Sequence, residues 1–233
     1  MNDNKEFLAT EPIGKLLLKL AVPTVAAQMI NMLYNIVDRI YIGHIPGSGS
    51  LALTGVGVCM PLIMIISAFA ALVGNGGAPR ASILMGKGDH EKAEKILGNC
   101  FTTQLIISVI LTFVMYLFNR PMLLAFGASG NTIEYAVSYM RIYALGPRFV
   151  QLTLGMNTFI TAQGFAKEGM LSVLIGAIVN IVLDPIFIFA LNMGVAGAAL
   201  ATIISQACSC VWVLSFLFGQ KTNLRIRKQN FAL

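Results

Sequence analysis

The sequence of 233 residues is 57% hydrophobic and only 11% charged, whereas soluble domains are about 25% charged. Its mean hydropathy of +0.78, together with apolar runs as long as the roughly 20 residues that cross a bilayer, excludes an ordinary soluble protein. In a soluble protein the net charge of +6 would suggest nucleic acid, but in a membrane protein it reports topology, so no nucleic-acid partner is expected.

Six apolar runs follow one another, and each is predicted to be a transmembrane helix because backbone groups cannot stay unpaired in lipid. The predicted spans are 16–41, 51–78, 97–118, 136–160, 170–191 and 195–218. The predicted fold class is therefore an all-α integral membrane protein, a six-transmembrane-helix bundle. The predicted domains are a cytoplasmic segment at 1–15, the transmembrane lobe at 16–219 and a basic cytoplasmic segment at 220–233.

The first span carries a line of polar residues that an ordinary lipid-facing helix would not have. Their spacings of 4, 3, 4 and 3 residues place them on one helical stripe: Thr24, Gln28, Asn31, Asn35 and Asp38. An Asp at the bilayer centre costs on the order of 3 kcal/mol on insertion scales. The stripe is therefore expected to face a protein interior or water.

Three later spans carry polar stripes of their own. The fourth has Thr153, Asn157 and Thr161, the fifth has Ser172, Gly176, Asn180 and Asp184, and the sixth has Thr202, Ser205, Gln206 and Ser209. Polar faces on four helices are expected to converge on one centre that water or protons can reach.

Of the ten acidic residues, only Asp38 and Asp184 lie well inside spans. Both spans run outward, so both carboxyl groups are expected in the outer half of the membrane. Two ionised carboxylates repel in a low-dielectric site, and a proton, a monovalent cation or a cationic substrate can relieve their charge. If only one of these is present at a time, the pair performs exchange. Interhelical hydrogen bonding without transport is the structural alternative for the same residues.

The basic residues predict the orientation of the chain. Twelve of them fall on one side of the predicted membrane: Lys5, Lys15, Lys19, Arg80, Lys87, Lys92, Lys95, Lys167, Lys221, Arg225, Arg227 and Lys228. The opposite loops hold only Arg120, so both termini are predicted to be cytoplasmic in a multi-pass protein of the cell membrane. Arg141 either pairs with an acid or snorkels to the headgroups, and the pattern assigns no role to Arg148.

At these residues the chain resembles the multidrug and toxic compound extrusion (MATE) family. The stretches that carry the resemblance are P-x4-Q at 23–28, LYNIVDRIYIGH at 33–44, NIVLDP at 180–185 and GVAGAALAT at 194–202. The resemblance implies a secondary antiporter, not an enzyme, that exports small organic, often cationic, compounds in exchange for H+ or Na+. It also implies two six-helix lobes, of which this chain would be the N-terminal one. Its partners would then be the lipid bilayer and either a C-terminal lobe or a parallel copy of itself.

The resemblance further implies a cation site. Its residues would be Asp38, Asn180, Asp184 and Thr202, which would hold H+ or Na+ as the coupling ion and require no other metal or cofactor. Tyr139 and Asn157 match further polar positions. Together with Gln28, Asn31 and Asn35 of the first-span stripe, they form the predicted polar substrate cavity.

Three other functions compete with antiport. A flippase for lipid-linked precursors, from a related superfamily, would be expected to have a more cationic cavity. An inactive membrane scaffold would not transport. An intramembrane aspartyl protease would place Tyr before one Asp and Gly-x-Gly before the other, whereas Val37 precedes Asp38 and Leu183 precedes Asp184.

Overall fold

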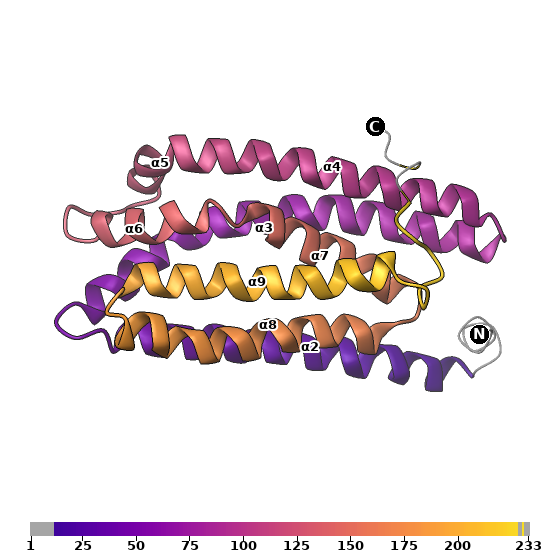
Figure 1. Ribbon diagram of the computed structural model, residues 1–233, viewed down its shortest axis with the longest axis horizontal. Coiled ribbons are helices and arrows are strands. Elements are labelled where there is room, and N and C mark those ends of the chain that lie inside the picture. Colours follow the sequence, from indigo (N-terminus) through magenta and orange to yellow (C-terminus); the bar gives the residue numbers. More distant parts are fainter. Residues whose placement is uncertain (1–11, 228–229, 231–233) are drawn as a thin grey trace.

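The computed structural model describes residues 12–227 and residue 230, and within them every extended regular element is a helix, which confirms the all-α fold class. The elements are α2 (Ile13–Gly43), α3 (Gly49–Gly86), α4 (His90–Leu117), α5 (Asn119–Ala125), α6 (Ile133–Tyr143), α7 (Pro147–Ala162), α8 (Ala166–Pro185), the π-helix η1 (Ile186–Ala190) and α9 (Val195–Phe218) (Figure 1). The predicted terminal segments 1–15 and 220–233 lie only partly within the described residues. Residues 1–11, 228–229 and 231–233 fall outside them, with Lys5 and Lys228 among them.

Five helical stretches of the described chain are long and apolar enough to cross a membrane: α2, α3, α4, α8 continued by η1, and α9. They correspond to five of the six predicted spans. The turn between α3 and α4 is stabilised by Asp89, whose side chain accepts a hydrogen bond from the Lys92 amide at 3.2 Å and pairs with the Lys92 ammonium at 2.7 Å. These bonds hold the pKa of Asp89 below its ordinary value and cap the first turn of α4.

The fourth predicted span, 136–160, is not one helix. Helix α6 ends at Tyr143 and α7 begins at Pro147, so the span is built from two helices with a break between them. Within the break, the amides of Leu145 and Gly146 bond the carbonyls of Ile142 and Tyr143, three residues back. Pro147 supplies the physical reason, because it has no amide to continue α6 and its fixed φ suits the first position of a new helix.

The fifth span changes its hydrogen-bond pattern after Pro185. The five residues that follow form η1, and the Leu191 amide bonds the Ile186 carbonyl five residues back at 2.9 Å. A proline removes an amide donor, so the usual hydrogen bonds to the carbonyl four residues back cannot all form. A π-turn, with bonds five residues back, is one way in which a helix continues past this point. The backbone of η1 at Phe187 and Ile188 packs directly on Gly197 of α9, where a Cβ atom would meet it at 2.7 Å.

The helices pack in a definite order around the bundle. Helix α2 packs mainly on α8, α8 on α9, and α9 on α6 and α7, while α3 packs on α7 and on α4. Helices α2 and α3 follow one another in sequence but share a much smaller contact. In Figure 1, α4 and α5 lie along one side of the bundle, and α2 and α8 lie along the other. The helices α2, α8, α9, α7 and α3 thus form a ring, and within this ring the contact between α2 and α3 is the smallest.

Helices α3 and α7 approach each other at two glycines. A Cβ atom on Gly74 would lie 2.9 Å from the Gly155 carbonyl oxygen, and one on Gly155 would collide with the Gln104 side chain from α4. Small residues at such crossings let helix backbones approach closely, which is how helices pack in lipid.

The bundle has two chemically different ends. One end, called the basic end below, carries the α3–α4 turn, the α7–α8 turn and the segment after α9, with Lys87, Lys92, Lys95, Lys167, Lys221, Arg225 and Arg227. The opposite end carries α5 and its ion pair between Arg120 and Glu134 at 2.8 Å.

A strap, residues 219–227, crosses the basic end after α9 and buries Thr222, Leu224 and Ile226. The Gln163 side-chain oxygen accepts hydrogen bonds from the Thr222 hydroxyl at 2.8 Å and the Leu224 amide at 2.7 Å. Glu94 of α4 accepts a bond from the Arg225 amide at 3.3 Å and pairs with the Arg227 guanidinium at 2.9 Å. Leu224 is fully buried. The strap therefore belongs to the folded lobe.

Candidate functional site

A cavity of about 810 Å³ lies between α2, α3, α7, α8 and α9, which is within the size range of small-molecule sites. Its lining is rich in hydroxyl and amide groups: Thr24, Gln28, Asn31, Tyr34, Asn75, Ser82, Thr153, Asn157, Thr158, Thr161, Ser205, Gln206 and Ser209. None of the described side chains that line it carries a charge. Parts of the polar stripes predicted on the first, fourth and sixth spans line this cavity, but Asn35, Asp38 and Thr202 do not.

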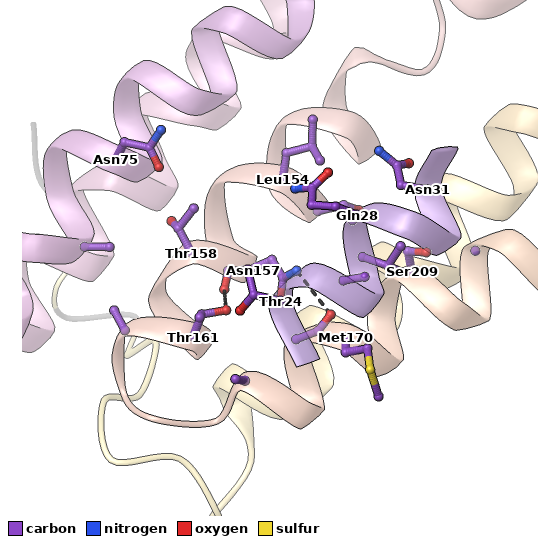
Figure 2. Close-up of a pocket in the computed structure, with 18 of the residues that line it drawn as sticks. Thr24, Gln28, Asn31, Asn75, Leu154, Asn157, Thr158, Thr161, Met170 and Ser209 are labelled. Atoms are coloured by element: carbon purple, nitrogen blue, oxygen red, sulfur yellow. Dashed lines mark hydrogen bonds between the residues drawn. The ribbon is translucent and has the colours of Figure 1, made fainter. Parts of the chain in front are cut away.

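The cavity has a buried floor and an exposed rim. Thr153, Ser205 and Ser209 on α7 and α9 are buried, whereas Gln28 on α2 and Asn75 on α3 are exposed. Figure 2 shows Asn75 across from Thr24 and Gln28, with Thr158 and Asn157 between them. The mouth of the cavity is therefore between α2 and α3, where the ring of helices closes least tightly.

Several hydroxyl groups that line the cavity donate hydrogen bonds to backbone carbonyls of their own helices. Thr24 donates to the Leu20 carbonyl at 2.8 Å, Thr158 to the Gly155 carbonyl at 2.6 Å, and Thr161 to the Asn157 carbonyl at 3.2 Å. Such bonds satisfy the hydroxyl donor and leave its oxygen lone pairs available toward the cavity.

Two amide oxygens of the lining remain without a donor among the described residues. The Asn157 amide nitrogen donates to the Gly169 carbonyl at 3.2 Å, but Asn157 Oδ1 and Gln206 Oε1 are buried and unpaired. Because an unpaired buried acceptor is costly, these oxygens suit a ligand that brings N–H or O–H donors.

Nearer the opposite end of the bundle, the carboxyl groups of Asp38 on α2 and Asp184 on α8 lie close enough to interact directly. Asp184 is fully buried, and its Oδ1 accepts a hydrogen bond from Asn180 Nδ2 at 3.2 Å. Asp38 Oδ1, Asn180 Oδ1 and Asp184 Oδ2 are buried with no donor among the described residues. A site with three unpaired oxygens and two carboxyl groups fits a proton or a small hard cation.

Two tyrosines border the acidic pair. Tyr139 of α6 is buried, lies within electrostatic range of Asp38 and within hydrogen-bonding reach of Thr202 on α9. Tyr34 lies within range of both carboxyl groups and also lines the cavity. Tyr34 is therefore the side chain that connects the acidic pair with the cavity.

The structure divides the predicted site residues between these two places. Gln28, Asn31 and Asn157 line the cavity, whereas Asn35 and Tyr139 do not. Asn35 Nδ2 donates to the Asn31 carbonyl at 2.6 Å, so part of this side chain is used by its own helix. Tyr139 stacks on Tyr143 with ring centroids 5.8 Å apart and belongs with the acidic pair.

Four polar lining residues were not predicted from the sequence: Tyr34, Asn75, Ser82 and Thr158. Tyr34 had a usable signal, because it is three residues after Asn31 and four before Asp38 and so falls on the predicted stripe. Asn75 and Ser82 on α3 are seven residues apart and share a helical face, but the intervening positions on that face are Ala78 and Pro79, so the sequence shows no continuous polar stripe there. Their place in the cavity follows from how α3 packs against α7.

The sequence model of the MatE family matches residues 23–186, which includes Asp38, Asn180, Asp184 and most of the cavity. The chain belongs to the MATE family. The MatE match ends before Thr202, which lies on α9 beyond the matched residues.

Curated relatives of this MATE chain are named as export proteins, not enzymes. The multidrug export protein MepA of Staphylococcus haemolyticus is 28% identical over 222 residues, which cover 95% of this chain and 48% of the relative. The protein of the same name from Staphylococcus aureus is 24% identical over 228 residues, which cover 96% of this chain and 50% of the relative. The chain thus spans about half the length of the curated relatives it matches.

Solved structures show the same relation. An outward-facing multidrug resistance MATE transporter of the MOP superfamily superimposes with a TM-score of 0.86 at 30% identity, over 94% of this chain and 48% of that one. A MOP superfamily transporter from Pyrococcus furiosus, described as having a binding pocket of reverse polarity that suggests a different function, gives the same TM-score, identity and coverage. This MATE chain therefore has the fold of about half of a multi-pass membrane transporter.

Proposed function

We propose that the chain is one lobe of a secondary antiporter that exports small organic compounds in exchange for H+ or Na+. The names of the curated relatives and the MATE fold support export. Complete transport would require a second lobe or a parallel copy of this one. The chain would lie in the cell membrane with its basic end and both termini in the cytoplasm, in accordance with the positive-inside rule.

The observation that carries the proposal is the acidic pair with its unpaired oxygens. Asp38 and Asp184 come from helices distant in sequence, and their free oxygens lie beside that of Asn180. Arg39 on α2 lies within electrostatic range of Asp38 but is only half-buried. Bringing two buried carboxyl groups together therefore remains unfavourable unless a proton or a cation joins them. The coupling ion would therefore be held by Asp38, Asn180 and Asp184, with Tyr139 and Thr202 next to them.

The second part of the proposal is that substrate occupies the neighbouring cavity. The volume suits a drug-sized molecule, and the unpaired oxygens of Asn157 and Gln206 favour compounds with N–H donors, including protonated amines. Because Tyr34 borders both places, a bound ion and a bound substrate would compete through it.

The test replaces each carboxyl group in the complete transporter. Asp38→Asn and Asp184→Asn each remove the titratable oxygen with little change of shape, and ethidium efflux should fall to background in both. Efflux is measured in proteoliposomes with either a proton gradient or a sodium gradient imposed alone, which also identifies the coupling ion. Asp89→Asn is the matched control, since it makes the same chemical change at an exposed helix cap that Asn also provides, and it should transport like the wild type.

Normal efflux in Asp38→Asn or Asp184→Asn at normal membrane abundance would refute the coupling role. Efflux that persists with no gradient at all would refute antiport itself.

The flippase alternative is weakened by the cavity lining. An anionic lipid-linked precursor would need basic groups near its phosphates, and no Lys or Arg is among the described lining residues. Flipping of a fluorescent lipid-linked oligosaccharide by the same proteoliposomes, without ethidium efflux, would favour the flippase.

A further inference from the structure

A second, smaller groove of about 220 Å³ lies on the other side of the bundle from the mouth of the cavity. It is lined by Ser108, Val109, Thr112, Phe113, Leu145 and Arg148, from α4, the break in the fourth span and the start of α7. The surrounding surface of α4 is strongly apolar, with Val109, Ile110 and Phe113 all more than half exposed. This apolar face is therefore expected to contact lipid, and the basic side chain of Arg148 lies on it.

Arg148 has no carboxylate partner among the described residues. The salt bridges of the described chain involve other basic residues, and the contact seen for this guanidinium is with the ring of its neighbour Phe149, at 5.1 Å. The Thr112 hydroxyl, which lines the same groove, makes no hydrogen bond within the described chain. The groove thus combines a cation and a free hydroxyl with an apolar wall.

The position of Arg148 is not explained by topology. It is 14 residues before the end of α7 at Ala162, a rise of about 21 Å from the basic end. Thr112 is five residues before the other end of α4 at Leu117, about 8 Å from that surface. In a hydrocarbon core about 30 Å thick, the groove lies in the leaflet opposite the basic loops, where the positive-inside rule disfavours basic residues.

We propose that this groove binds an anionic phospholipid of the leaflet opposite the basic end. The Arg148 guanidinium would extend toward that surface and pair with the lipid phosphate, as long basic side chains do near a membrane interface. The Thr112 hydroxyl would donate a second hydrogen bond, and an acyl chain would lie along Val109 and Phe113. An anionic lipid offsets the free energy of keeping an otherwise unpaired charge on an apolar face.

The experiment measures retention of phosphatidylglycerol by the complete protein. The protein is purified from liposomes of phosphatidylcholine with a minor fraction of phosphatidylglycerol, and bound lipids are counted by native mass spectrometry. Arg148→Gln should weaken phosphatidylglycerol retention about fivefold, as expected for one basic side chain at a lipid surface, without changing phosphatidylcholine retention. Arg148→Lys keeps the charge and should retain most of the binding.

Arg141→Gln is the matched control. It removes the same charge from an exposed position one helix earlier, outside the groove, and should leave phosphatidylglycerol retention unchanged. Equal retention by Arg148→Gln and the wild type, or an equal loss in Arg141→Gln, would overturn the proposed site. A loss of both lipids in Arg148→Gln would also overturn it, because the groove would then not distinguish an anionic headgroup.

Discussion

At the scale of single residues, some polar groups of the site have hydrogen-bond partners within the protein and others have none. The hydroxyl groups of Thr24, Thr158 and Thr161 donate hydrogen bonds to backbone carbonyls of their own helices. In contrast, oxygens of Asn157, Gln206 and the acidic pair are buried and unpaired. Gln104 Oε1 and Gln151 Oε1 are also buried and unpaired, but they lie outside the site. Because an unpaired buried acceptor is costly, the free oxygens within the site are where a substrate or an ion gains the most by binding.

Gln206 offers a direct test of this distinction within the cavity. Gln206→Leu removes the unpaired Oε1 but keeps a similar volume, so a compound with N–H donors should bind about tenfold more weakly, the loss expected for one hydrogen bond to a charged donor. The measurement is tryptophan quenching by ethidium and by an uncharged analogue without N–H groups. The analogue should bind equally well or better, and equal weakening of both compounds would mean that Gln206 acts through packing alone.

At the scale of helices, the sequence predicted most of the elements, and the errors have local causes. Long apolar runs identified five spans because length and hydropathy decide whether a helix crosses lipid. Pro147 predicts a kink in the fourth span, but the division into two helices was not predicted because hydropathy continues through the break. The π-turn after Pro185 was missed because a proline predicts a disturbance but not its form.

The candidate site was predictable only in part, also for a physical reason. Stripes with helical spacing predicted Gln28, Asn31 and Asn157 in the cavity, since one helix determines which of its residues share a face. Asn75 and Ser82 could not be predicted, because their exposure to the cavity depends on how α3 packs on its neighbours. The proximity of Asp38 and Asp184 was expected from their matching depth, and in the structure their carboxyl groups are close enough to interact.

The close approach of α3 and α7 yields a prediction with an internal control. Gly74→Ala places a methyl group 2.9 Å from the Gly155 carbonyl oxygen, so the helices must separate, and the cost should be about 1–3 kcal/mol of stability. Gly76→Ala is on the same helix with nothing within 4 Å of the added methyl group and should be neutral or slightly stabilising. Thermal unfolding in detergent compares the two, and an equal midpoint would show that the crossing is not tightly packed.

At the scale of the whole molecule, the two proposed binding places have separate surroundings. The cavity and the acidic pair are enclosed by α2, α8 and α9 on one side, and the groove at Arg148 is on the outside of α4 and α7. Helix α2 has a long apolar surface, with Ile13, Leu17, Met32 and Ile40 more than half exposed. This surface belongs to the same helix as one side of the cavity mouth.

The strap over the basic end has a consequence for how the polypeptide can be cut. Lys221, Arg225 and Arg227 are sites for trypsin, but a protease needs an extended, unfolded segment, and the bonds to Gln163 and Glu94 hold this one in place. Cleavage here should therefore be slow in the wild type and faster in Gln163→Ala, which loses the acceptor for Thr222 and Leu224. Gln220→Ala, in the same segment but with an exposed side chain, should digest like the wild type. Equally rapid digestion of all three proteins would mean that the segment is already loosely held.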